Sequence, residues 1–138
     1  MPTVKLTLAV LHAVFAVCRF EPYEPIPAWS LQGFFAVTRT DDELSIVCPQ
    51  ANVPLEIRKT GVEGEWRCFK VEGPLAFALT DVLLAIAAPL AAAGISIFAI
   101  STYKTDYVLV KQHALEQAIQ TLAQAGHRVI EEADHAAS

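Results

Sequence analysis

The amino-acid sequence predicts an α+β protein made of two tandem βαββαβ units, the first with shortened helices. Three observations predict this fold. A strand-turn-strand pattern occurs twice in the chain, a further strand pattern precedes each copy, and the second half contains two segments with helical periodicity. We expect the two units to span residues 1–62 and 63–138.

The composition is typical of a protein with a large hydrophobic core. Of the 138 residues, 54% are hydrophobic and 18% are charged. Disordered chains combine low hydrophobicity with high net charge, so disorder is excluded. The formal net charge is -5 and the ten basic residues are scattered along the chain, so we expect no binding to nucleic acid.

The repeated hairpin is the main organising signal. The segment FAVTRTDDELSIVC begins at Phe35 and aligns without gaps with FAISTYKTDYVLVK, which begins at Phe98. Each segment is a strand, a polar turn and a second strand. We therefore expect Phe35 to superpose on Phe98 and Val47 on Val110. The acidic turn of the first copy is expected to lie at the tip of its hairpin, with Glu43 equivalent to Asp106.

A strand is expected before each hairpin, because FAVCRFE at residues 15–21 resembles WRCFKVE at residues 66–72. Only the second copy then has room for a full helix before its hairpin. Apolar residues at helical spacing predict a helix from about Leu79 to Ala93, ended by Gly94. In the first copy, the proline-rich segment PYEPIPAWSLQG allows only one short turn.

The chain ends with a second helix and a closing strand. Residues 113–126 carry an apolar stripe formed by Leu115, Ala118, Ile119, Leu122 and Ala125. The segment HRVIEE, residues 127–132, is expected to be a strand, and the last six residues a frayed tail.

An uncharged run at residues 82–100 is long enough to span a membrane. The alternative is a buried helix that leads directly into a buried strand. Pro89 and Gly94 interrupt the run, no basic cluster flanks it, and the residues after Gly94 are β-branched and aromatic. We therefore favour the helix and strand, and expect no association with membranes.

The cysteines and the N-terminus indicate a cytoplasmic protein. Cys18, Cys48 and Cys68 form no CxxC pair, and each lies in an apolar run, so we interpret them as buried thiols in a reducing compartment. The first residues lack the pattern of a secretory signal.

No motif for catalysis, metal binding or cofactor binding is present in the sequence. The four histidines share no metal-ligand spacing with one another or with a cysteine, so we expect them at the surface or at sheet edges. Neither a nucleophile elbow nor a glycine-rich phosphate loop occurs. We therefore expect no enzymatic activity, no metal and no cofactor.

Three segments resemble the ACT-domain family, in particular small bacterial two-ACT proteins and the related ACT domains of the eukaryotic cytosolic arginine sensor. These segments are residues 89–110, residues 34–49 and the run WRCFKVEGPL. The resemblance implies two ferredoxin-like ACT units. It also implies a non-catalytic regulatory role, in which a small metabolite, usually an amino acid, binds in the crease between ACT units.

The resemblance further implies a ligand-binding turn. The Thr-aromatic-x-x-Asp turn of the arginine sensor matches Thr102, Tyr103 and Asp106. A carboxylate there is suited to hold the amino group of a ligand. The family's glycine and glutamate ahead of the long helix fall on Ala76 and Leu79, so the match does not specify arginine.

Gly73 and Pro74 complete the predicted ligand-binding set, because they follow a strand and precede the long helix. Gly73 either permits close approach of the backbone to a ligand or forms an unusual turn. The expected partners are the small-molecule ligand, a second copy of the chain in a homodimer, and a regulated protein reached in trans. The competing hypothesis is a structural or dimerisation module that binds no metabolite.

Overall fold

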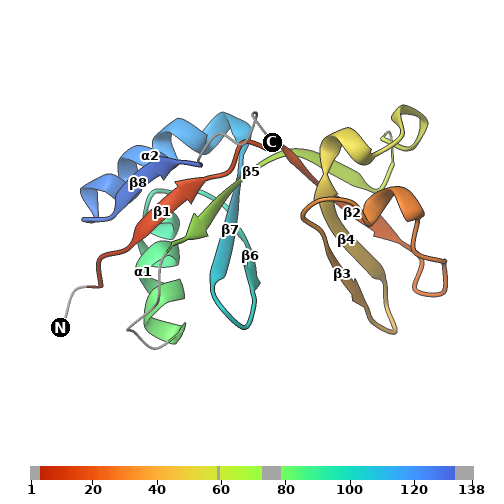
Figure 1. Cartoon of the computed structure of the whole chain (residues 1–138), viewed down its shortest axis with the longest axis horizontal. Helices are drawn as coiled ribbons and strands as arrows, with labels where there is room; N and C mark the ends of the chain where they lie inside the picture. The colour runs from red at the N-terminus through yellow and green to blue at the C-terminus, as the bar shows by residue number, and fades with distance from the viewer. Residues whose placement is uncertain (1–3, 59, 73–78, 133–138) are drawn as a thin grey trace. The chain divides into compact units, whose positions relative to one another are not determined.

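The computed structural model describes residues 4–58, 60–72 and 79–132. Within this range the chain forms two compact units of α+β structure (Figure 1). The N-terminal unit comprises residues 13–66, and the C-terminal unit comprises residues 1–12 and 67–138.

The N-terminal unit is a four-stranded antiparallel sheet in the order β3-β4-β2-β5. Its strands are β2 (Phe15–Phe20), β3 (Ala36–Arg39), β4 (Leu44–Pro49) and the first part of β5 (Val62–Val71). Short 3-10 turns replace the expected helices, namely η1 (Ala28–Ser30), η2 (Gln50–Asn52) and η3 (Leu55–Ile57). Its small core is formed by Ala16, Cys18, Leu44, Ile46, Cys48 and Val53. The prediction of shortened helices in the first unit is therefore confirmed.

The C-terminal unit is a sheet in the order β6-β7-β5-β1-β8 with two helices. Its elements are β1 (Thr7–Val10), the last part of β5, α1 (Leu79–Ala92), β6 (Phe98–Ser101), β7 (Asp106–Lys111), η4 (Gln112–Ala114), α2 (Leu115–Gln124) and β8 (Arg128–Glu131). Strand β1 pairs antiparallel with β5 and parallel with β8.

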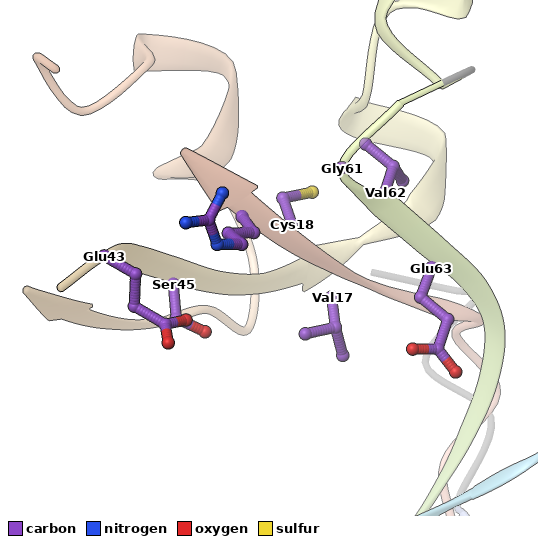
Figure 2. A pocket seen from close by; sticks show the side chains of 8 residues that line it. Val17, Cys18, Glu43, Ser45, Gly61, Val62 and Glu63 are labelled. Carbon is purple, nitrogen blue, oxygen red and sulfur yellow. The ribbon is translucent and has the colours of Figure 1, made fainter. Parts of the chain in front are cut away.

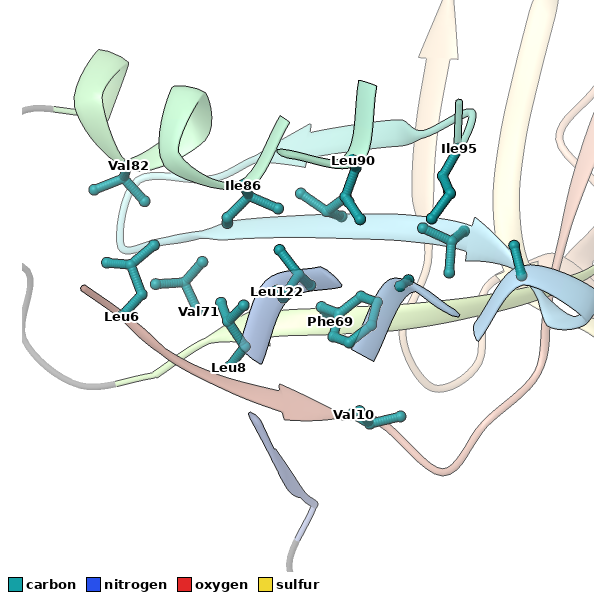
Figure 3. Packing of buried hydrophobic residues seen from close by; sticks show 14 residues of the cluster. Leu6, Leu8, Val10, Phe69, Val71, Val82, Ile86, Leu90, Ile95 and Leu122 are labelled. Atoms are coloured by element: carbon teal, nitrogen blue, oxygen red, sulfur yellow. The ribbon is translucent and has the colours of Figure 1, made fainter. Parts of the chain in front are cut away.

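Both helices pack on one face of this sheet around a single apolar core (Figure 3). Helix α1 contributes Val82, Ile86 and Leu90, which recur at helical spacing and are fully buried. Helix α2 contributes Ala118 and Leu122. The sheet presents alternate residues of β1, β5 and β7 to the same core, namely Leu8, Val10, Phe69, Val71, Val108 and Val110.

The uncharged run at residues 82–100 divides into a helix and a strand, as predicted. Helix α1 ends at Ala92, and Gly94 adopts a φ of 75° in the left-handed region that closes helices. Strand β6 begins at Phe98. None of the helices in the described part of the chain is long and apolar enough to cross a membrane. The three cysteines are buried and free, also as expected.

The unit boundaries differ from the predicted division at residues 62 and 63. The N-terminal strand β1 belongs to the C-terminal unit, where it lies between β5 and β8. Short-range patterns along the sequence cannot reveal this pairing, because β1 and β8 are separated by almost the whole chain. The N-terminal unit is thus an insertion between two neighbouring strands of the C-terminal unit.

The predicted register of the repeat is wrong by one residue. The structural equivalents are Ala36 and Phe98, which pair with Val47 and Leu109, so the spacing is 62 and not 63. Each hairpin has four residues in its turn, and the first of these is a threonine whose hydroxyl bonds the residue three positions later. These turns fix the register, and a one-residue shift would place every side chain on the opposite face.

The correction changes the counterpart of the predicted ligand residue. Leu44 begins β4 at the position where Asp106 begins β7, and Glu43 corresponds to Thr105. The expected equivalence of Glu43 and Asp106 is therefore contradicted.

His127 is not at the surface, since only 6% of its surface is exposed, but it directly precedes the edge strand β8, which agrees with the expected alternative of a sheet edge. The N–H of Leu6 donates to Nδ1 of the ring at 3.1 Å. Because Nδ1 accepts, Nε2 carries the hydrogen and donates to the carbonyl of Ala85 at 2.9 Å. The ring thus connects the segment before β1, the segment before β8 and helix α1.

Removal of residues 1–12 is expected to unfold the C-terminal unit. It would remove Leu6, Leu8 and Val10 from the core, where the burial of each contributes about 1.5–3 kcal/mol, and β8 would lose its partner strand. The sum of roughly 4–9 kcal/mol is close to the whole stability of a typical domain. Circular dichroism and urea titration of the shortened chain measure this. A cooperative transition at the parental urea concentration would contradict the role of β1.

Replacement of His127 by alanine is expected to lower the free energy of unfolding by about 2–4 kcal/mol, because a buried N–H and a buried carbonyl lose their partners. His113→Ala is the control, since His113 is exposed and should change stability little. Urea denaturation of both variants provides the comparison. Equal midpoints would show that the ring contributes no net stability.

Candidate functional site

The turn between β6 and β7 is rigidly built by its two threonines. The N–H of Thr102 donates to the carbonyl of Thr105 at 2.8 Å. The hydroxyl of Thr102 donates to the same carbonyl at 3.0 Å and accepts from the N–H of Thr105 at 3.2 Å. These three bonds close residues 102–105 into one compact turn.

Thr105 attaches this turn to the neighbouring strand. Its side chain is 6% exposed, and its hydroxyl donates to the carbonyl of Val71 at 2.8 Å, at the end of β5. The root of the hairpin is therefore held where β5 ends and β7 begins. Sequence reasoning did not identify this role of Thr105, which is equivalent to Glu43 of the first unit in the correctly aligned repeat.

Asp106 is the unusual group at this site. It is the first residue of β7, pairs with Ser101 and is only 1% exposed. Among the residues that the structure describes, its Oδ2 atom has no hydrogen-bond partner. A buried carboxylate oxygen without a partner is costly, because the charge loses its hydration and gains nothing in return. Its oxygen is a ready acceptor for an ammonium, guanidinium or N–H group.

The other predicted site residues lie in different environments. The hydroxyl of Thr102 is already used within the turn. The side chain of Tyr103 is fully exposed at the tip of the hairpin. Gly73 and Pro74 lie outside the described residues, as does Ala76. The structure thus brings Thr102 and Asp106 into one hairpin and leaves Tyr103 at its tip.

The equivalent position of the N-terminal unit cannot bind in the same way. Leu44 is fully buried there and has no charge to offer. The guanidinium of Arg39, the residue before the turn, donates to the carbonyls of Pro22 and Glu24, the second at 2.8 Å. Two carbonyl groups of the loop beside the first hairpin therefore already accept hydrogen bonds from a residue of the chain itself. The two units are alike in fold but differ in their chemistry.

Metal binding and thiol chemistry find no support among the described residues. Histidine, cysteine, aspartate and glutamate form no group of three or more there that could hold a metal ion. Burial, with a smaller effect from the carboxylate of Glu132, raises the pKa of the Cys68 thiol to about 12. A hydrogen bond with Cys48, together with burial, raises the pKa of the Cys18 thiol. The thiols of Cys18 and Cys68 therefore stay protonated and are poor nucleophiles at neutral pH. The same hydrogen bond lowers the pKa of the Cys48 thiol, which is buried.

Two family models match the chain. A model described as an ACT domain matches residues 61–124. A second model, described as an N-terminal domain, matches residues 13–56. Together they cover parts of both structural units.

Solved structures and curated proteins agree with these matches. A crystal structure from Agobacterium tumefaciens is 41% identical, covers 96% of this chain and 97% of its own, and superposes with a TM-score of 0.87. The regulatory subunit of aspartate kinase from Thermus thermophilus has the same fold, with a TM-score of 0.55 over 86% of this chain and 96% of its own, at 14% identity.

One curated relative is the cytosolic arginine sensor for mTORC1 subunit 1 of Bos taurus. It is 36% identical in an alignment of 101 residues that covers 70% of this chain. This chain spans only 31% of the length of that relative.

Replacement of Asp106 by leucine, the residue of the first unit, is expected to raise the free energy of unfolding by roughly 1–3 kcal/mol. The change removes a buried oxygen that lacks a partner, and leucine fits the equivalent place in the first hairpin. Asp42→Leu is the control, because Asp42 is exposed. Thermal and urea denaturation without added ligand give the comparison. A less stable Asp106→Leu variant would mean that the carboxylate serves the fold itself.

Proposed function

The chain belongs to the ACT-domain family, and on this basis we propose that it is a regulatory protein that binds a small metabolite, specifically a free amino acid, and has no catalytic activity of its own. Binding of the ligand would change the contacts that the chain makes with a regulated protein. We also propose that two copies of the chain form a homodimer and that the protein is located in the cytosol.

The buried Oδ2 atom of Asp106, which has no hydrogen-bond partner among the described residues, carries this proposal. Function often requires a group that is unfavourable for stability, and a buried carboxylate oxygen without a hydrogen-bond partner is such a group. The ammonium group of an amino acid would supply the missing partner as a charge-assisted hydrogen bond. The fixed turn of Thr102 and Thr105 holds the carboxylate in one position, so little order would have to be gained on binding.

The relatives support the ligand class but not one ligand. The bovine relative is named as an arginine sensor, and the Thermus protein, whose 14% identity shows the fold alone, as the regulatory subunit of aspartate kinase. The resemblance described for the sequence places Ala76 and Leu79 at the positions of the family's glycine and glutamate. We therefore propose an amino acid whose cationic group meets Asp106, with Thr102, Tyr103, Gly73 and Pro74 as further contacts.

A thermal-shift screen of the full chain against the twenty amino acids tests the proposal. A ligand present at about 100 times its dissociation constant should stabilise the folded chain by roughly 2.7 kcal/mol. Basic amino acids are expected among the active compounds, because they carry an additional cation. An empty screen would favour the alternative of a structural or dimerisation module.

Asp106→Asn is expected to weaken binding of the ligand found in the screen by about tenfold to a hundredfold, because asparagine keeps the size but removes the charge. Glu116→Gln is the matched control, since Glu116 is exposed on α2 in the same unit. Isothermal titration of the parent chain and both variants gives the affinities. Equal affinity of Asp106→Asn and the parent chain would move the site elsewhere.

A further inference from the structure

A hollow of about 360 Å³ lies within the N-terminal unit, on strands β2, β4 and β5. Figure 2 shows the side chains of Val17, Glu43, Ser45 and Glu63 on the same side of these strands, while Cys18 points to the other side. The opposite face carries the core of the unit. This hollow is therefore on the face of the sheet that its own core does not use.

The strand register explains why these side chains meet. Arg19 of β2 pairs with Ser45 of β4, and Val17 pairs with Glu63 of β5. Residues 17 and 19 share one face because alternate residues of a strand point the same way. A backbone hydrogen bond fixes the rim of the hollow where β2 meets the start of β5, since the N–H of Arg19 donates to the carbonyl of Gly61 at 2.7 Å.

Gly61 is required for this close contact. It has a φ of 70°, and a Cβ atom there would lie 2.9 Å from the carbonyl oxygen of Arg19. Any larger residue would push β2 and the start of β5 apart. The geometry of the rim is thus fixed by the backbone and not by flexible side chains.

Charged side chains of both signs line the hollow. Within residues 4–58, 60–72 and 79–132, the side chains of Arg19, Glu43 and Ser45 take part in no hydrogen bond or ion pair. Arg19 shares the hollow with two carboxylates, those of Glu43 and Glu63. A guanidinium, a hydroxyl and a carboxylate therefore remain available to a ligand that carries complementary groups.

We propose that this hollow is a second small-molecule site, which takes a small zwitterion with a carboxylate and an ammonium group. The planar guanidinium of Arg19 suits a carboxylate, which it can bind through two parallel hydrogen bonds. Glu43 and Glu63 suit the ammonium group, and Ser45 supplies a hydroxyl between them. Val17 gives the floor an apolar surface, and the volume is in the range of small-ligand sites.

This site goes beyond the proposed function and is not its repeat in the other unit. The site at Asp106 depends on a buried carboxylate at the start of β7, whereas the structural equivalent of that residue, Leu44, faces the core of the N-terminal unit. The hollow uses residues of the opposite face of the sheet. An experiment that shows no binding at one of these sites therefore does not exclude binding at the other.

Amide chemical shifts of the ¹⁵N-labelled full chain distinguish the two sites. The twenty amino acids are added singly at millimolar concentration, each with its N-acetyl and carboxamide forms, which lack one of the two charges. The proposal predicts shifts at residues 17–19, 43–45 and 61–63 with at least one amino acid, and weaker binding of both of its modified forms. Absence of any shift at these residues would overturn it. Shifts at residues 102–107 report separately on the proposed function.

Two variants test the charges. Arg19→Gln and Glu63→Gln are each expected to weaken the binding seen at residues 17–19 by about tenfold. Asp106→Asn should leave it unchanged. Arg128→Gln is the matched control, because Arg128 is an exposed arginine on strand β8 of the other unit. Binding at residues 17–19 that survives both Arg19→Gln and Glu63→Gln would overturn the proposal. Far-UV circular dichroism verifies that each variant is folded.

Discussion

The pairing of β1 with β5 and β8 is the constraint on which the C-terminal unit depends. Leu8 and Val10 of β1 lie in the same core as both helices, and β8 has no other partner strand in the described structure. His127 adds a second connection between the N-terminal segment and α1 through two buried hydrogen bonds. Because β1 comes first in the chain and β5 follows residue 61, the whole N-terminal unit must form between two strands that are neighbours. The two units are therefore not independent segments of the sequence, and loop closure over this distance costs entropy that the core must offset.

The two hairpins have the same local structure but differ in the chemistry of one buried side chain. Both use a threonine to close a four-residue turn, and both continue into a strand with the same pattern of burial. In the first hairpin the strand begins with a buried leucine, which favours stability. In the second it begins with a buried aspartate that has an unpaired oxygen, which is unfavourable in the absence of a partner. The difference of one side chain separates a purely structural hairpin from a candidate binding site.

The candidate site was predictable in part. Asp106 and Thr102 could be selected from the sequence because the turn resembles that of a known family, and the structure places both in one hairpin. The role of Thr105 could not be selected, because its partner is a carbonyl on β5 that is 34 positions away. Tyr103 was selected from the same resemblance, but the turn leaves its side chain fully exposed. The second hollow was not predictable either, since Arg19, Ser45 and Glu63 meet only through the register of three strands.

The sequence by itself determined the elements with strong periodicity. Apolar spacing identified α1 and α2, a glycine marked the end of α1, and alternating strands marked both hairpins, because such patterns report local geometry directly. Tertiary structure alone decided which strands are neighbours, which residue of one hairpin matches which of the other, and which histidine is buried. Alignment of the two repeats by residue identity placed Phe35 on Phe98, whereas the strand pairing of the hairpins places Ala36 there. The physical reason is that register and strand order depend on contacts between distant segments. No single short stretch of the sequence determines the free energy of those contacts.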